Sequence, residues 1–218
     1  MKKAAVLLSG CGNMDGSEIH ESVSAVTALD LAGWKIVFIA PDTRQARTVS
    51  YLTGKPVEHR NALEEAARIA RGDIKALEMS ILDDVDAVVV PGGFGAALTL
   101  CDFAERGIDC QAHPQVKEFL QLAHKKGKPV AAMCIAPALI ARCIPGATVT
   151  TGNDSNTAEA IEKMNCSHME CSAEEVIVDR KNRIITTPAY MTATGPGEVF
   201  KGAVRMVEEL DRMISEGK

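Results

Sequence analysis

The stretch Ala131-Ala132-Met133-Cys134-Ile135-Ala136-Pro137 places one cysteine between a short apolar run and a segment that opens with proline. The apolar run is typical of a buried strand. Proline is favoured at the first helical position, because no intrahelical hydrogen bond needs its missing N–H there. The stretch therefore predicts a sharp strand-to-helix turn that presents Cys134 as a candidate nucleophile. The alternative is a small buried hydrophobic residue, since free cysteines are among the most buried residue types.

A helix that begins directly after Cys134 gives this thiol a particular electrostatic environment. The N-terminus of a helix carries partial positive charge, and its free amides point toward a nearby anion. Positive charge near a thiol favours the thiolate over the thiol. We therefore expect a lowered pKa for Cys134 and a reactive thiolate at neutral pH.

Three further apolar runs are each followed by a loop that carries acids or glycines. Residues 1–8, 34–40 and 85–90 are predicted strands, and the last run ends in Pro91-Gly92-Gly93-Phe94-Gly95. Residues 15–21 are predicted to open a helix that continues to Gly33. Its apolar positions at helical spacing are Val23, Val26, Ala28, Leu29 and Leu31. In a parallel sheet such loops meet at the carboxyl edge, where open α/β folds bind their ligands.

These segments predict an α/β fold of the doubly wound, flavodoxin-like class, with a mostly parallel sheet and helices on both faces. At this point the order of several motifs resembles a known family. SGCG, DGSEIHE, LTG, VPGGFGAA, MCIAPA and TTPAYM follow one another along nearly the whole chain. The combination resembles the PfpI/ThiJ superfamily, relatives of the class I glutamine amidotransferases, and within it the ElbB-type proteins, described as isoprenoid-biosynthesis-linked glyoxalases. The resemblance implies a single domain over residues 1–218, a homodimer, and no cofactor or metal.

The resemblance also implies roles for individual residues. Cys134 matches the family nucleophile, and Glu21 matches the buried acid that hydrogen-bonds the cysteine sulfur. Gly93 and Ile135 match the residues whose amides form an oxyanion hole. Glu18 precedes Glu21 by one helical turn and is a candidate second acid at the pocket. The implied reaction converts a small reactive carbonyl compound, methylglyoxal or glyoxal, into a hydroxy acid through a cysteine hemithioacetal and an enediol.

One feature departs from the superfamily pattern. Many members carry a histidine in the loop after the strand that follows the cysteine turn, and residues 148–154 contain none. Asp154 or Asn153 can at most orient a water there. Among the histidines, only His20 belongs to a motif of the predicted site, and the alternative is a packed, hydrogen-bonded histidine without a site role.

Two other functions are compatible with a cysteine on such a turn. A non-catalytic sensor would use reversible oxidation of Cys134, with Glu21 stabilising a sulfinate. An amidase or peptidase would need a general base whose protonated form then protonates the leaving amine. The missing loop histidine argues against this function.

Composition favours a single intracellular domain. The chain has 218 residues, of which 46% are hydrophobic and 4% aromatic, enough for a large aliphatic core. The net charge of -5, with acidic and basic residues well mixed, argues against nucleic-acid and membrane-surface partners. Seven cysteines without regular spacing favour a reducing compartment, so we expect a cytoplasmic location. The apolar run Ala4–Leu8 is shorter than the roughly 7–15 residues of a signal-peptide core, and no stretch approaches the roughly 20 residues of a transmembrane helix.

The remaining segments are predicted as scaffold. Helices are expected over residues 61–71, 114–126, 157–164 and 197–216, and a hairpin over residues 175–179 and 183–187. The chain around Gly54 is predicted as a loop. Residues 166–171, Cys-Ser-His-Met-Glu-Cys, carry soft metal-ligand types, but a structural zinc site needs four ligands in paired spacings, so we expect a surface cluster. Residues 186–191, Thr-Thr-Pro-Ala-Tyr-Met, either line the pocket or pack at a strand end.

Overall fold

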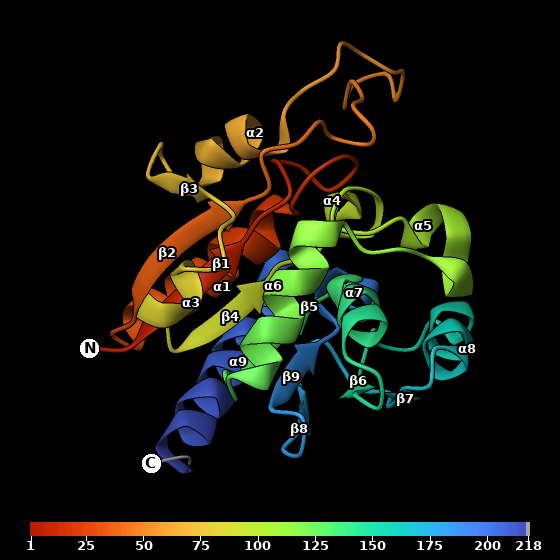
Figure 1. Ribbon diagram of the computed structural model, residues 1–218. Helices are drawn as coiled ribbons and strands as arrows, with labels where there is room; N and C mark the ends of the chain where they lie inside the picture. The colour runs from red at the N-terminus through yellow and green to blue at the C-terminus, as the bar shows by residue number, and fades with distance from the viewer. Residues whose placement is uncertain (217–218) are drawn as a thin grey trace.

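The computed structural model describes residues 1–216. A seven-stranded sheet runs through the middle of the molecule (Figure 1). Its strands, in spatial order, are β3 (Ile74–Ala76), β2 (Lys35–Ala40), β1 (Lys3–Leu7), β4 (Ala87–Val90), β5 (Val130–Met133), β9 (Ile184–Thr187) and β8 (Ile177–Asp179). All neighbouring strands pair in parallel except β8 and β9, which are antiparallel. The predicted doubly wound, flavodoxin-like α/β fold is confirmed.

Helices cover both faces of this sheet. One face packs against α1 (Ile19–Leu31), α2 (Ala62–Ile69) and α9 (Pro196–Glu216). The opposite face, which is turned toward the viewer in Figure 1, packs against α3 (Ile81–Asp84), α4 (Phe94–Leu98), α5 (Phe103–Arg106), α6 (Pro114–Lys125), α7 (Ala136–Cys143) and α8 (Ser155–Lys163). Two short strands, β6 (Thr148–Val149) and β7 (Ser167–His168), form a separate ribbon beside α8.

The central strands are buried on both faces, which explains their continuous apolar runs. In β4, Val88 and Val90 enter the core on the α6 side, whereas Ala87 and Val89 enter the core on the α9 side. The side chains alternate because successive residues of a strand point to opposite faces. Strands covered by helices on both sides therefore lack the polar alternation of a half-exposed sheet.

Helix α1 differs from its prediction in start and in buried face. It begins at Ile19, because the Glu18 side chain caps it, and residues 15–17 belong to the preceding loop. Its buried face carries small residues such as Ala25 and Ala28, whereas Val23 and Leu31 are 51% and 73% exposed. Helix α1 lies alongside α9, and small side chains allow two packed helices to approach closely.

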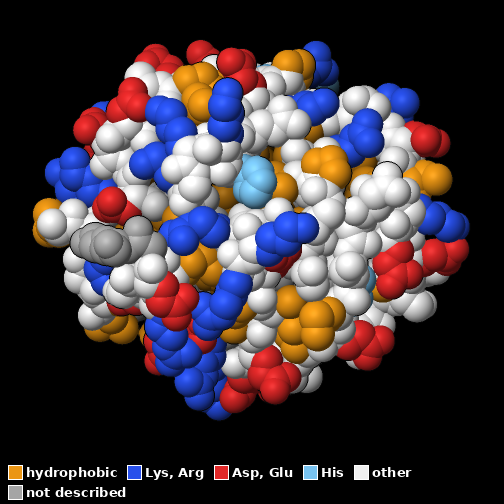
Figure 2. Space-filling view, turned by 60° about the horizontal axis from the view of Figure 1, so that its bottom comes forward, with side chains coloured by type: hydrophobic (Ala, Val, Ile, Leu, Met, Phe, Trp, Pro, Cys, Tyr) orange, Lys and Arg blue, Asp and Glu red, His pale blue; other side chains and the backbone are white. Residues whose placement is uncertain are grey.

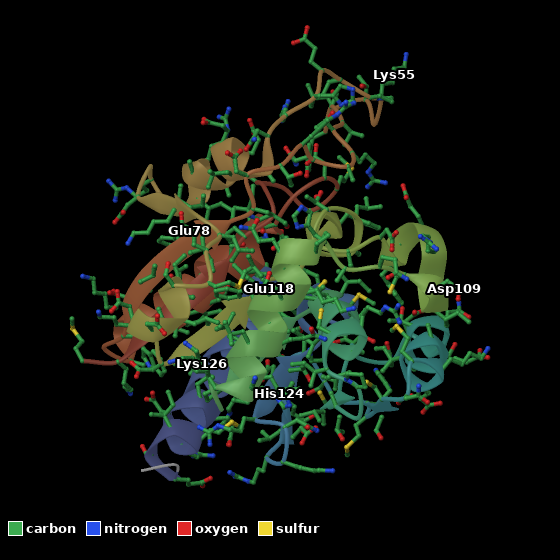
Figure 3. All side chains as sticks on the ribbon, in the orientation of Figure 1. Lys55, Glu78, Asp109, Glu118, His124 and Lys126 are labelled. Carbon is green, nitrogen blue, oxygen red and sulfur yellow. The ribbon has the colours of Figure 1, made fainter. Side chains whose placement is uncertain are left out.

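The edge strand β3 is absent from the sequence prediction. It has only three residues and pairs with β2 through Phe38 and Ile74. Its central residue is Lys75, so it lacks the apolar run that marks the other strands. The segment before it, residues 41–61, is a long connection with two isolated bridges, Arg44 to Asn61 and Val49 to Pro56. Lys55 lies at the outer end of this connection, far from His124 on α6 and from Lys126 directly after that helix (Figure 3).

The other scaffold predictions agree with the structure to within a few residues at each end. Asn61 caps α2 by accepting hydrogen bonds from the amides of Leu63 and Glu64, and the predicted hairpin is formed by β8 and β9. The predicted surface cluster at residues 166–171 is wrong for Cys166, which is 8% exposed and whose thiol contacts the carbonyl oxygens of Ala141 and Ile144. Within residues 1–216, no group of three or more His, Cys, Asp or Glu side chains is arranged to hold a metal ion.

Acidic, basic and apolar side chains all occur on the face shown in Figure 2, where the hydrophobic side chains form small separate groups. None of the helices in the described part of the chain combines the length and the apolar character required to cross a membrane.

Candidate active site

Cys134 lies on the strand-to-helix turn between β5 and α7. Its backbone adopts a positive φ of 60°, which is uncommon for a residue other than glycine. The Cys134 amide continues the sheet by donating to the Thr187 carbonyl at 3.0 Å. The residue is 8% exposed. Strain of this kind is typical of functional sites, where the surrounding structure holds a side chain in one direction.

Glu21 is completely buried beside this cysteine. One carboxyl oxygen accepts from the Gly92 amide at 2.9 Å, and the other accepts from the Tyr190 amide at 3.3 Å. The pKa of Glu21 is raised from its ordinary 4.5 to about 7, first by burial and then by the negative charge of Glu18, while hydrogen bonds with Cys134 and the two amides act in the opposite direction. A carboxyl group with this pKa gives up and takes back a proton near neutral pH.

The pKa of the Cys134 thiol is raised well above its ordinary value, first by burial and then by the charge and hydrogen bond of Glu21. The amides of Gly93 and Ile135 act in the opposite direction. The expected net lowering of this pKa by the helix N-terminus is therefore wrong, because burial outweighs it. The Cys134 thiol and the Glu21 carboxyl group therefore form a buried, hydrogen-bonded pair.

The two amides that face the sulfur come from the residues predicted for the oxyanion hole. The Ile135 amide follows the cysteine on the turn, and the Gly93 amide comes from the loop after β4. Gly93 has φ 89°, and a Cβ on it would lie 2.4 Å from the Gly16 carbonyl oxygen and 2.5 Å from the Glu18 nitrogen. Glycine is required there because the neighbouring backbone leaves no room for a side chain.

Glu18 is placed one turn before Glu21 and has two roles in the structure. Its carboxylate accepts from the Glu21 amide at 2.6 Å and so caps α1. Its own amide donates to the Gly92 carbonyl at 3.0 Å, which ties the start of α1 to the loop after β4. Glu18 also lines the cavity described next, where its charge acts on Glu21.

A cavity of about 740 Å³ opens in front of Cys134 at the carboxyl edge of the sheet. Asn13, Glu18, His20 and Tyr190 line it with polar atoms, and Gly93, Cys134 and Ile135 contribute the turn and its amides. The remaining lining residues are apolar: Phe94, Ala97, Phe103, Ala104 and Met191. The structure thus brings together five of the sequence-predicted residues, Glu18, His20, Gly93, Cys134 and Ile135, with Glu21 buried behind them.

His20 and Tyr190 form a hydrogen-bonded pair at this cavity. The Nδ1 atom of His20 lies 2.6 Å from the Tyr190 hydroxyl, and the two ring centroids are 5.8 Å apart. His20 is exposed and Tyr190 is half-buried. The sequence analysis left open whether residues 186–191 line the pocket; Tyr190 and Met191 do. They follow Ala189, whose φ of 45° turns the chain toward the cavity, and no sequence signal marks that turn.

Asp154 does not join the site. It caps α8, where its carboxylate accepts from the Thr157 amide at 2.8 Å, and it is not among the residues that line the cavity. The loop that lacks a histidine is instead contacted by His168 from β7, whose Nε2 accepts from the Thr151 amide at 3.0 Å. Burial lowers the pKa of His168, and this histidine does not line the cavity either.

Comparison with known proteins identifies the family of the chain. The model of the DJ-1/PfpI family matches residues 2–209. A human protein named glutamine amidotransferase-like class 1 domain-containing protein 3, mitochondrial, is 38% identical over 95% of this chain and 82% of its own length. The zebrafish ES1 protein, mitochondrial, is 30% identical over 97% of this chain and 86% of its own length.

Solved structures give the same result. An isoprenoid biosynthesis protein with an amidotransferase-like domain from Ehrlichia chaffeensis is similar with a TM-score of 0.89 and 32% identity, over 96% of this chain and 99% of that one. DJ-1beta of Drosophila melanogaster shares the fold with a TM-score of 0.56 at 22% identity, over 99% of this chain and 94% of that one. The motifs, the sheet order and these matches together show that the chain belongs to the DJ-1/PfpI family.

Proposed function

We propose that the protein is a cofactor-independent glyoxalase that converts methylglyoxal or glyoxal into the corresponding hydroxy acid. The observation that carries this proposal is the buried Cys134–Glu21 pair, in which the pKa of Glu21 is about 7 and two amides face the sulfur. A single carboxyl group near neutral pKa suits proton transfer next to a carbonyl. Amide cleavage needs in addition a group that protonates a poor leaving amine.

In the first step Cys134 adds to the aldehyde. The thiol proton passes to the Glu21 carboxylate, the sulfur–carbon bond forms, and the carbonyl π electrons move onto oxygen. The Gly93 and Ile135 amides stabilise the resulting oxyanion. Protonation of that oxygen by Glu21 completes the hemithioacetal and leaves Glu21 as a carboxylate again.

In the second step Glu21 moves a proton between the two carbons. The carboxylate removes the hydrogen from the carbon that bears sulfur, which gives an enediolate, and returns it to the neighbouring carbon. The hydroxyl proton on the first carbon then passes to the oxygen on the second carbon, which leaves the thioester of a 2-hydroxy acid. Water adds to the thioester, its hydroxyl stays on the acyl carbon, and the cysteine thiol is restored as the hydroxy acid departs.

Tyr190 and His20 are proposed to support the second carbonyl oxygen during this transfer. Desolvation and the charges of Glu18 and Glu21 raise the pKa of the Tyr190 phenol, so it remains a hydrogen-bond donor. His20, which is exposed and bonded to that phenol, links it to solvent.

The test is a substrate panel with purified protein. Wild type is expected to consume methylglyoxal and glyoxal but not to hydrolyse glutamine or peptides, and Cys134→Ala is expected to lose the carbonyl activity. Cys171→Ala is the matched control, because that thiol is half-buried outside the cavity. The proposal would be overturned if Cys134→Ala consumed methylglyoxal as fast as wild type. It would also be overturned if Cys171→Ala lost the carbonyl activity and Cys134→Ala kept it.

A second candidate function is a cysteine-oxidation sensor. It is favoured by the raised pKa of Glu21, because a protonated carboxyl group beside the sulfur can donate a hydrogen bond to a sulfinate oxygen. Intact-mass measurement after mild peroxide treatment distinguishes the two. A sensor gains two oxygen atoms at Cys134 and turns over no carbonyl substrate, whereas the glyoxalase turns over substrate in its reduced state.

We further propose that the protein acts as a homodimer in the cytoplasm, with small carbonyl compounds rather than nucleic acid or membranes as its partners. The family resemblance supports the dimer, and the mixed charge argues against nucleic-acid and membrane partners. The seven cysteines without regular spacing favour a reducing compartment. Light scattering of the purified protein tests the dimer, and a monomer at micromolar concentration would contradict it.

A further inference from the structure

The cavity in front of Cys134 has two chemically different walls. Glu18, His20 and Tyr190 line it from the face of the sheet that carries α1, and Phe94, Ala97 and Ala104 line it from the opposite face, on α4 and α5. Helices α4 and α5 contact each other, and α4 also contacts α7, whose start follows the cysteine (Figure 1). The site therefore offers polar groups on one side of the sulfur and an apolar surface on the other.

The size of the cavity is that of a site for a much larger molecule than methylglyoxal. Its volume of about 740 Å³ falls in the range of roughly 300–1,000 Å³ that is typical of sites for drug-sized ligands. Methylglyoxal carries a single methyl group beyond its two carbonyls. Once its aldehyde carbon is bonded to Cys134, that methyl group leaves most of the apolar wall facing water.

Part of the apolar wall is exposed to solvent, and a bound ligand would cover this exposed surface. Phe94 is 46% exposed, and Ala104 is exposed as well. The Arg47 guanidinium lies 4.8 Å from the centroid of the Phe94 ring, and its Nε donates to the Met14 carbonyl at 2.9 Å. The guanidinium therefore packs against the Phe94 ring and restricts its position.

We propose that the preferred substrates are α-oxoaldehydes that carry a bulky apolar substituent. This inference rests on the proposed glyoxalase function and adds the substrate class. The aldehyde carbon bonds to Cys134, the second carbonyl faces His20 and Tyr190, and the substituent lies against α4 and α5. The overall reaction adds one water to RCOCHO and gives RCH(OH)COOH, an internal redox change that needs no external oxidant or reductant.

The test compares phenylglyoxal with methylglyoxal, by measuring mandelate and lactate formation. Wild type is expected to show a kcat/KM for phenylglyoxal at least about tenfold above that for methylglyoxal, since small differences in apolar contact in a hydrophobic pocket produce effects of ~10–200-fold. Ala104→Phe fills the apolar side from an exposed position. It is expected to lower kcat/KM for phenylglyoxal by about tenfold or more, mainly through KM, and to lower kcat/KM for methylglyoxal much less.

Glu105→Phe is the matched control, because Glu105 is an exposed neighbour on α5 that does not line the cavity. Fluorescence of Trp34, the one tryptophan of the chain, verifies that both variants are folded. Turnover of methylglyoxal by wild type without preference for phenylglyoxal, or equal losses for both substrates in Ala104→Phe, would overturn the substrate class but leave the glyoxalase function standing. Absence of turnover with either substrate would overturn both.

Discussion

Replacing Glu21 by glutamine is expected to remove a pH dependence from the stability of the protein. The pKa of Glu21 is about 7 in the folded state instead of its ordinary 4.5, and one pKa unit corresponds to about 1.4 kcal/mol. The folded state therefore binds this proton more tightly than the unfolded state by roughly 3 kcal/mol. Because Glu21 is completely buried, solvent screening does not reduce this figure.

The sign follows from which state holds the proton. A carboxyl group with a raised folded-state pKa contributes its full stability below pH 4.5, and that contribution is lost as the pH rises to about 7. Several other carboxyls, among them Asp179 and Glu198, have lowered pKa values and act in the opposite direction. Their effect is the same in wild type and variant, so the difference between the two proteins isolates Glu21.

The assay is urea denaturation followed by the fluorescence of Trp34, which is 4% exposed in the folded protein. Between pH 5 and 8, the free energy of unfolding of Glu21→Gln is expected to rise relative to that of wild type by about 2.5 kcal/mol. The side-chain amide of glutamine cannot accept from both the Gly92 and Tyr190 amides, which adds a constant offset but no pH dependence. Parallel curves for the two proteins would refute a raised pKa for Glu21.

Three further outcomes are expected. Glu21→Gln should lower carbonyl turnover by ~10²–10⁴-fold, and Glu18→Gln should lower it far less; equal, small losses would mean that neither carboxyl moves a proton in the rate-limiting step. Gly92→Ala should destabilise the fold by about 1–3 kcal/mol, because its Cβ would lie 2.5 Å from that of the cysteine nucleophile; an unchanged urea midpoint would contradict this contact. Tyr190→Phe should lower kcat by about 10²-fold with little change in KM, and His20→Ala should shift the pH profile of kcat; wild-type kinetics in both variants would remove the pair from the mechanism.

The sequence was sufficient for the fold because the elements that define it have strong local signals. The apolar runs of β1, β4 and β5 are long enough to identify, since helices cover both faces of these strands. The loops after them carry Glu18, Gly93 and Cys134 to one edge, as a parallel sheet requires. Edge strand β3 escaped prediction because three residues centred on a lysine carry no apolar periodicity.

Electrostatics and long-range contacts were less accessible from the sequence. The pKa of the cysteine depends on how deeply tertiary packing buries it and on its distance from Glu21, neither of which a local motif shows. Tyr190 enters the cavity because Ala189 adopts a positive φ. Positive φ is uncommon for alanine, so the sequence does not predict this conformation. The sequence places Asp154 in a loop near the predicted site, but in the structure it caps α8. Aspartate is one of the residues preferred at the N-cap of a helix.

The most direct test of the proposed chemistry is the number of lactate molecules formed per protein molecule from methylglyoxal. A free thiol traps an aldehyde once, whereas a catalytic cysteine is released and reacts again. Wild type is expected to form lactate linearly far beyond one equivalent, and Cys134→Ala none above the buffer blank. Lactate formation that stops at one equivalent in wild type, or continues in Cys134→Ala, would contradict the account.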